Sequence, residues 1–271
     1  MDHDCWHIDF ATYCRRISNE IPDADGIELT FEHPDLFSIY PSKKVVQYVN
    51  DIVSTYNFRS IAMHAPTRDV NISSYNPRIR QTSFNELIKS LELFIQIDGP
   101  KLIYFLVHGG QNSFRAPSRF SKRNLHTSLS NHIDNLIKLD KICENFGITL
   151  TIENLIYSSW RLTSKIEYLD ALFDEVPNIK FAFDIDHAIF VSYSYANKML
   201  NKYLNRINVI HIGNINIFNK FKNLLIPINP SYVFEPHSIK NKFQLFQSLN
   251  RNVKTIKNVV ENFKKPEITV P

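Results

Sequence analysis

A predominantly apolar run near the middle of the chain ends in two aspartates and a histidine. Residues 179–183 read Ile-Lys-Phe-Ala-Phe, and Asp184, Asp186 and His187 follow. If the run is a buried strand, Asp184 lies at its carboxyl end and His187 in the next turn, where ligands are commonly bound. Such groups suit metal binding and proton transfer. The alternative is a helix N-cap, in which Asp184 or Asp186 accepts hydrogen bonds from free N–H groups.

Five other apolar runs end in a residue of the same kind. These residues are His64, His108, Glu153, His211 and Glu235. A lone histidine at a strand end is more often a hydrogen-bonded structural residue, and a lone glutamate is more often a cap or a surface group. Six such ends in one chain favour a shared cation, because burying several carboxylates without one carries a large electrostatic cost.

The residue types also indicate the chemistry of this expected site. Imidazole together with carboxylate suits Zn²⁺ or Mn²⁺ better than Ca²⁺ or a metal that prefers thiolates. We expect one or two divalent ions per chain. Such an ion polarises a carbonyl or hydroxyl group of the substrate, while Glu153 and Glu235 move protons as a general acid and base pair.

The elements that must position these residues alternate regularly between strand and helix. The predicted strands cover residues 5–10, 26–31, 58–63, 102–107, 148–152, 179–183, 207–210 and 231–234. The predicted helices cover 11–21, 41–56, a segment from about 82 that Gly99 ends, 125–146, 164–175, 195–204 and 241–263. We expect turns from Asp69 to Pro77, and residues 214–230 show no clear pattern of either kind.

Eight strands joined by helix-length connections require parallel pairing through right-handed crossovers. The prediction is therefore an α/β protein, a single-domain (β/α)₈ TIM barrel over residues 1–271, with a tail at 264–271. In that fold the carboxyl ends of the strands share one rim, where catalytic groups lie. The alternative is a doubly wound open sheet, but no Gly-x-Gly-x-x-Gly follows any strand.

Composition sets limits on the class of protein. The chain has 271 residues, 44% hydrophobic and 21% charged, which is typical of a globular domain. Its net charge of +4 neither requires nor excludes a phosphate-bearing partner. Three cysteines without paired spacing indicate neither a disulfide framework nor a zinc knuckle. Without a signal peptide or a long apolar stretch, we expect a cytoplasmic protein that does not bind membranes.

A series of short motifs then resembles one known family. The motifs are Gly26-Ile-Glu-Leu, His64-Ala-Pro, Asn71-Ile-Ser-Ser with Arg80, Val107-His-Gly-Gly, Thr151-Ile-Glu-Asn, Phe183-Asp-Ile-Asp-His-Ala and Val209-Ile-His-Ile. Their order is similar to that of the xylose-isomerase-like TIM-barrel superfamily, which includes sugar isomerases, sugar epimerases and endonuclease IV. The resemblance covers nearly the whole chain.

The resemblance implies roles for individual residues. In the epimerases of this superfamily four residues bind the metal, and the residues of this chain that resemble them are Glu153, Asp184, His211 and Glu235. In those enzymes the first and last of the four also exchange substrate protons. The pair His64 and His108 is similar to the pair that, with Glu153, binds a second metal in endonuclease IV. Substrate contacts are expected from His187, Asn154, Arg80 and His237, although His237 also suits a helix cap or a surface position.

Seven basic residues are predicted in the loops after the third and fourth strands. They are Arg68, Arg78, Arg80, Arg115, Arg119, Lys122 and Arg123. They suit a phosphate of a sugar or of DNA, but a solvated basic face explains them equally well.

Three functions follow, in order of preference. The first is a metal-dependent isomerase or epimerase of a sugar or sugar phosphate. The second is an endonuclease IV-like phosphodiesterase acting on abasic DNA, which the histidine pair favours; the missing Asp-x-His between His211 and Glu235 opposes it. The third is a barrel without catalysis. The sequence leaves the identity of the sugar and the oligomeric state open, and a homo-oligomer is compatible with it.

Overall fold

Seven parallel strands form the centre of the molecule and pair in the order in which they occur along the chain. The structure is a computed structural model that describes residues 8–113, 119–235 and 242–264, without the side chains of 119–123, 242–244 and 264. The strands are β1 Gly26–Leu29, β2 Ser60–His64, β3 Lys101–His108, β4 Thr149–Glu153, β5 Lys180–Asp184, β6 Ile207–Ile212 and β7 Ser231–Phe234.

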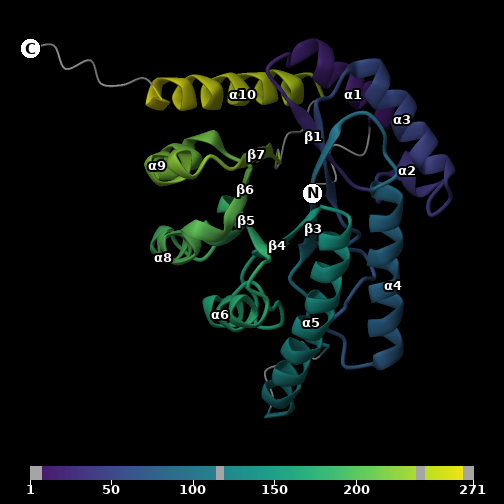
Figure 1. Ribbon diagram of the computed structural model, residues 1–271. Coiled ribbons are helices and arrows are strands. Elements are labelled where there is room, and N and C mark those ends of the chain that lie inside the picture. The colour runs from purple at the N-terminus through teal and green to yellow at the C-terminus, as the bar shows by residue number, and fades with distance from the viewer. Residues whose placement is uncertain (1–7, 114–118, 236–241, 265–271) are drawn as a thin grey trace, which may run out of the picture.

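Helices surround these strands in an outer layer (Figure 1). They are α1 Phe10–Glu20, α2 Pro34–Phe37, α3 Lys44–Tyr56, α4 Pro77–Phe94, α5 Arg119–Asn145, α6 Ile166–Glu175, α7 Ile185–Ile189, α8 Tyr193–Tyr203, α9 Ile215–Leu225 and α10 Lys242–Lys264. Two short 3₁₀ helices, Leu204–Arg206 and Ile226–Ile228, precede β6 and β7. The predicted fold class is confirmed: the chain forms a nearly closed TIM barrel in a single domain.

The strand predicted at residues 5–10 is wrong in its described part. Phe10 begins α1, and the side chain of Asp9 accepts a hydrogen bond from the N–H group of Thr12 at 2.8 Å. An N-cap of this kind satisfies a free donor of the first helical turn, which a strand cannot do. Residues 5–7 lie outside the described residues. The described residues therefore contain seven barrel strands, not the eight predicted.

Two further predictions need correction. The helix predicted from about residue 82 begins earlier, at Pro77: the side chain of Asn76 accepts from the N–H of Arg78 at 2.9 Å, and proline suits the first helical position. Residues 215–225 form α9 although no element was predicted there. Asn214 caps this helix, and it buries Phe218, Phe221 and Leu225 at a spacing of three to four residues.

Alternation along the strands places the predicted polar ends directly above a small interior core. That core consists of Ala62, Tyr104, Leu106, Ala182 and Val209, with Ile103 and Val233 packed against it. Successive strand residues point to opposite faces, so a residue two positions later points the same way. Residues 64, 108, 184, 211 and 235 each follow a member of this interior group by two positions. They therefore form the next layer, at the carboxyl rim of the barrel.

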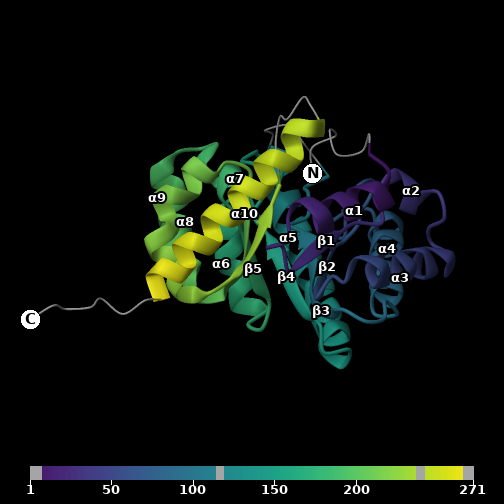
Figure 2. The same cartoon turned by 90° about the horizontal axis from the view of Figure 1, so that it is seen from above.

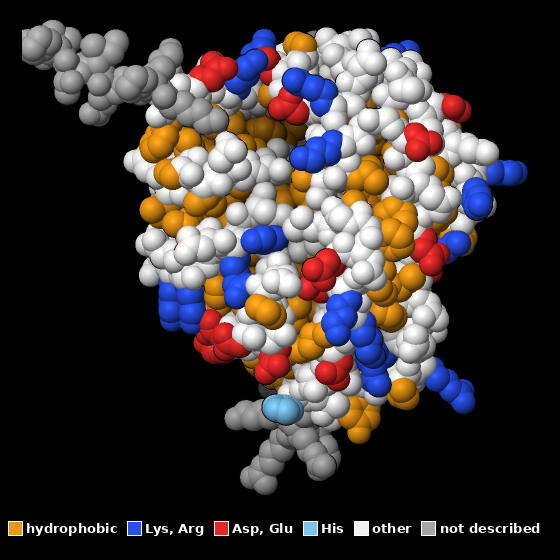
Figure 3. All heavy atoms as spheres, in the orientation of Figure 1, with side chains coloured by type: hydrophobic (Ala, Val, Ile, Leu, Met, Phe, Trp, Pro, Cys, Tyr) orange, Lys and Arg blue, Asp and Glu red, His pale blue; other side chains and the backbone are white. Residues whose placement is uncertain are grey.

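The barrel is interrupted between β1 and β7, for which no pairing is found among the described strands. A cavity of about 820 Å³ runs along this gap, lined by both strands and by α1 and α10. Part of the face in Figure 3 is hollowed, with hydrophobic side chains inside. Helix α10 packs against α1 (Figure 2), and Phe246 of α10 lies fully buried beside Tyr13. The packing of α10 on α1 spans the gap.

Candidate metal centre

Strand register brings the predicted ligands together. His108 lies opposite Glu153 in the pairing of β3 with β4, and Asp184 lies opposite His211 in the pairing of β5 with β6. The N–H group of Glu235 donates to the carbonyl of Ile212 at 3.1 Å, which extends the β6 and β7 pairing to that residue. The predicted shared rim is therefore present in the structure.

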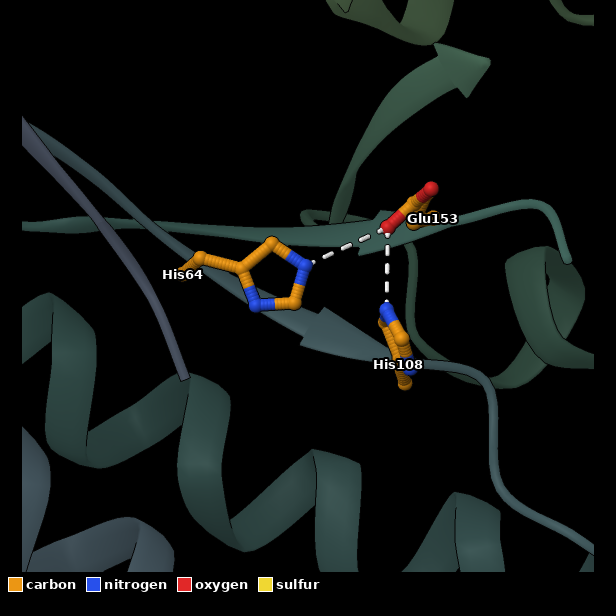
Figure 4. A group of neighbouring side chains, drawn as sticks. All are labelled: His64, His108 and Glu153. Atoms are coloured by element: carbon orange, nitrogen blue, oxygen red, sulfur yellow. Dashed lines mark ion pairs between the residues drawn. The ribbon is translucent and has the colours of Figure 1, made fainter. Parts of the chain in front are cut away.

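Glu153 lies close to four histidines of the rim. Its Oε2 atom lies 3.6 Å from Nε2 of His64 and 3.3 Å from Nε2 of His108, and both rings point toward that oxygen (Figure 4). Its Oε1 atom lies 3.2 Å from Nδ1 of His187 and 3.8 Å from Nδ1 of His211. Burial alone would raise the pKa of Glu153, but its close contacts with His108, His187 and His64 hold it well below its usual value. Glu153 is therefore a buried carboxylate anion.

Asp184 both caps a helix and faces the cluster. Its Oδ1 atom accepts from the N–H of His187 at 2.7 Å, which caps α7, while Oδ2 lies 3.3 Å from Nδ1 of His187. Burial, with the charges of Glu153 and Glu235, raises the pKa of Asp184 to about 7. Burial would lower the pKa of His187, but Asp184 and Glu153 raise it to about 9. The cap interpretation is thus confirmed, and it leaves one oxygen of Asp184 for a ligand.

His211 is fully buried between two glutamates. Its Nδ1 atom lies 3.2 Å from Oε1 of Glu235, and its Nε2 atom lies 3.4 Å from Oε2 of Glu28. Burial would lower the pKa of His211, but Glu235 and Glu28 raise it well above the usual value. Burial would raise the pKa of Glu28, but the charge of His211 lowers it overall. Without a metal, the ring is therefore a cation held between carboxylates.

Glu28 was missed as a site residue. It lies inside β1, and its Oε2 atom accepts a hydrogen bond from the hydroxyl of Tyr104 at 2.5 Å. The sequence contains one signal for it: a glutamate between Ile27 and Leu29, in a strand that also belongs to the Gly26-Ile-Glu-Leu motif. A charged residue in a short strand suits an exposed outer face equally well, so only the position of His211 shows its partner.

The donor set fits a divalent cation. Among the described residues of this cluster, four buried atoms have no hydrogen-bond partner: Oε2 of Glu153, Oδ2 of Asp184 and both ring nitrogens of His211. Buried polar atoms are rarely left unsatisfied, and those of a metal site are satisfied by the ion. Three groups have one ligand atom per residue within 4.8 Å of one another: His64, His108 and Glu153; Glu153, Asp184 and His187; and Glu28, His211 and Glu235. Carboxylate and histidine groups are thus positioned to bind a metal.

The quartet expected from the resemblance is divided between two of these groups. Asp184 and Glu153 belong with His187, whereas His211 and Glu235 belong with Glu28. The 3.8 Å contact between Glu153 and His211 joins the two groups. His187, expected to contact substrate, lies within the cluster itself.

Comparison with known proteins places the chain in a family. Residues 20–223 match the family described as xylose isomerase-like TIM barrel. The chain belongs to this family. MJ1614, an uncharacterized protein of Methanocaldococcus jannaschii, is 29% identical over 204 residues, which cover 68% of this chain and 73% of the relative.

Solved structures share the fold of this xylose isomerase-like barrel. The 3-keto-D-glucoside 4-epimerase YcjR of E. coli, in its apo form, has a TM-score of 0.71 at 14% identity, covering 90% of this chain and 94% of that one. D-psicose 3-epimerase with D-tagatose, from Clostridium cellulolyticum H10, has a TM-score of 0.71 at 13% identity, covering 94% and 95%. At these identities the likeness shows the fold.

The expected substrate-contacting residues of this family member lie in different settings. The side chain of Asn154 is bonded to the main chain of Asp184, and Nη1 of Arg80 donates to the carbonyl of Ser74 at 2.7 Å. His237 lies outside the described residues, as does Arg115 of the basic group. Among the described helices, none is both long and apolar enough to cross a membrane. Lys264 ends α10, and the rest of the predicted tail is not described.

Proposed function

We propose that the protein is a divalent-metal-dependent isomerase or epimerase of a sugar or sugar phosphate. The observation that carries this proposal is the convergence of two buried glutamates on one ring nitrogen. Nδ1 of His211 lies 3.2 Å from Glu235 and 3.8 Å from Glu153. Two carboxylates that share one metal-binding histidine offer both an ion site and a pair of groups for proton transfer.

The residues that would hold the ion are those predicted from the sequence. Glu153, Asp184, His211 and Glu235 would hold Mn²⁺ or Zn²⁺, and His64 and His108 together with Glu153 would hold a second ion. When bound, such an ion supplies Lewis acidity toward adjacent oxygens of the substrate. Burial of the cluster limits access of water and strengthens these electrostatic interactions.

Proton transfer is assigned to the two glutamates. One carboxylate removes the proton from a carbon next to the carbonyl, and the other, entering protonated, returns a proton to carbon. The low pKa of Glu153 keeps it ionised in the metal-free protein, which is the state that a general base requires. His187 lies beside both Glu153 and Asp184, and we assign it the role of contacting an oxygen of the substrate.

The substrate class is supported by the neighbours in fold. The solved structures named above are described as epimerases of a keto-glucoside and of D-psicose. An arginine near the rim can bind a phosphate through its guanidinium group only where that group is not already bonded to the protein. Arg80 is bonded to Ser74, so we rank unphosphorylated sugars first.

Two measurements test the proposal. Metal analysis of the purified protein is expected to find at least one Mn²⁺ or Zn²⁺ per chain. The Glu153→Gln variant is expected to lose this ion. With D-psicose, D-tagatose and related ketoses in D₂O, the wild type is expected to exchange deuterium into carbon. Glu235→Gln should lose about 10²- to 10⁴-fold of this exchange, the usual range for a general acid or base. Glu167→Gln, an exposed change on α6, is the control and should keep full activity.

A metal-free protein with no exchange into any sugar would overturn the proposal and leave a barrel without catalysis. Unchanged exchange in Glu235→Gln would remove only the proton-transfer role.

The phosphodiesterase is the second candidate, favoured by the pair of histidines on one oxygen of Glu153. Their distances of 3.6 Å and 3.3 Å suit a metal bound by the three residues. Such an ion would lower the pKa of a bound water toward neutrality. Nicking of an abasic-site duplex by the metal-loaded protein, abolished by His108→Ala, would establish this activity. The absence of nicking across Mn²⁺, Zn²⁺ and salt conditions would eliminate it.

A further inference from the structure

Glu28 and Tyr104 form a buried polar pair on the side of His211 that faces away from Glu153. They come from β1 and β3, and His211 comes from β6. The side chain of Glu28 is 4% exposed, and Tyr104 is also buried. Their hydrogen bond is 2.5 Å long, and the Glu28 oxygen that accepts it is the oxygen nearest to Nε2 of His211. The three residues therefore form a chain of contacts across the barrel interior.

Burial of the Glu28 carboxylate lowers the stability of the fold unless its contact with His211 compensates. Burying an ionised carboxylate is unfavourable without a partner, and the ion pair found for Glu28 among the described residues is with His211. A core of aliphatic side chains would fill the same space at lower cost. The ring of His211 is flanked on both sides, since Nδ1 faces Glu235 and Glu153 while Nε2 faces Glu28.

The geometry decides which nitrogen binds an ion. Nδ1 faces two carboxylates, whereas Nε2 faces one oxygen that already accepts a hydrogen bond from Tyr104. A histidine that binds a metal through one nitrogen commonly donates its other N–H to a carboxylate, which sets the tautomer and the ring orientation. Neither ring nitrogen makes a hydrogen bond in the structure, but Nε2 lies 3.4 Å from Oε2 of Glu28, in position to donate its hydrogen there once Nδ1 binds an ion.

We propose that Glu28, held in place by Tyr104, is a positioning residue that accepts the Nε2–H of His211 and presents its Nδ1 to the metal. This role rests on the proposed metal centre. Glu28, His211 and Glu235 have ligand atoms within 4.8 Å of one another, but Oε2 of Glu28 already accepts from Tyr104, so the proposal places Glu28 outside the ligand shell. Tyr104 fixes the carboxylate, so it supports the histidine at one further remove.

The test measures Zn²⁺ and Mn²⁺ affinity of the full chain by calorimetry. Glu28→Leu removes the acceptor and should weaken binding about 10- to 100-fold, the usual effect of losing such a partner. Glu28→Gln keeps an oxygen that can accept the Nε2–H, so its Kd should lie between those of wild type and Glu28→Leu. Tyr104→Phe should weaken binding about 3- to 10-fold, as expected for one hydrogen bond.

Tyr203→Phe is the matched control. Tyr203 is also a buried tyrosine, and its hydroxyl contacts the carbonyl of Ile166 and a carboxylate oxygen of Asp170 far from the cluster. This variant loses a comparable hydroxyl and should bind metal as the wild type does. Thermal unfolding of every metal-free variant identifies loss of fold, and Glu28→Gln and Tyr104→Phe keep the test open if Glu28→Leu does not fold.

A second readout reports the ring directly. In the Zn²⁺-loaded wild type, ¹⁵N spectra of the histidine side chains should show His211 protonated at Nε2 and metal-bound at Nδ1. Zinc on Nε2, or equal Kd values for the wild type, Glu28→Leu and Tyr104→Phe, would overturn the positioning role alone. A wild type that binds neither ion would overturn the proposed function and, with it, this role.

Discussion

Asn154 holds both main-chain polar groups of Asp184. The N–H of Asp184 donates to Oδ1 of Asn154 at 2.8 Å, and Nδ2 of Asn154 donates to the carbonyl of Asp184 at 2.9 Å. The carbonyl of Asn154 also accepts from Nδ1 of His187 at 2.9 Å in the tautomer that carries hydrogen there. The end of β4 therefore sets the position of the first residues after β5.

Asn154→Asp should loosen this connection. Aspartate has the same shape but, when ionised, cannot donate, so the carbonyl of Asp184 loses its partner and a further carboxylate enters the cluster. We expect the free energy of unfolding to fall by about 1–3 kcal/mol, the usual cost of an unsatisfied buried group. Urea titration measures this, with Asn201→Asp on the exposed face of α8 as control. Equal midpoints for the wild type and both variants would contradict the expectation.

Gly109→Ala tests the close approach of two loops at the rim. A Cβ atom at residue 109 would lie 1.8 Å from Oγ1 of Thr163, whose hydroxyl donates to the carbonyl of Glu153 at 2.7 Å. Alanine must displace Thr163 and disturb the end of β4. Overpacking of this kind costs about 1–3 kcal/mol.

A double-mutant cycle checks the cause. In a Thr163→Gly background the alanine has room, so the additional cost of Gly109→Ala should be smaller than in the wild type. Equal costs in the two backgrounds would show that Thr163 is not the obstacle.

His132 should make stability depend on pH. It lies fully buried in α5, neither ring nitrogen has a hydrogen-bond partner, and burial lowers its pKa from 6.5 to about 4. Between these values the unfolded chain binds a proton that the folded chain does not. The neutral ring therefore contributes roughly 3 kcal/mol to the free energy of unfolding above pH 6.5. This contribution is lost as the pH drops toward 4.

The measurement is the urea midpoint at several pH values from 4.5 to 7.5. The stability difference between the wild type and His132→Asn should shrink as the pH falls toward 4.5, because only the wild type loses the contribution of the neutral ring. His126→Gln, an exposed change on the same helix, should follow the wild type at every pH. The same slope in His132→Asn and the wild type would assign the pH dependence to other groups.

Two contacts of α10 should differ strongly in their contribution to stability. Phe246 is fully buried, with its ring 5.7 Å from that of Tyr13 and the guanidinium carbon of Arg16 3.8 Å from its centre. Phe246→Ala should cost about 3–5 kcal/mol. The ion pair between Lys257 and Asp23 is solvent-exposed, so Lys257→Ala should leave the urea midpoint close to the wild-type value. A larger loss in Lys257→Ala than in Phe246→Ala would reverse this assignment.

Local patterns were sufficient to predict the alternation of strands and helices and the rim of polar strand ends. Apolar runs such as 179–183 reveal their strands because a buried parallel strand must be apolar on both faces. The end of each run then places His64, His108, Glu153 or Asp184 without reference to the rest of the chain. Helix α9 was missed because its asparagines and lysines obscure the spacing of three buried side chains.

The sequence by itself determined which residue types stand at the carboxyl ends of the strands, since that depends on chain order and on the two-residue repeat of a strand. Only the tertiary structure decided how they group: Glu153 among four histidines, Asp184 as both cap and cluster member, and Glu28 against His211. The interruption between β1 and β7 was also decided there. These features depend on register and on side-chain direction between strands far apart in the chain, which no local pattern records.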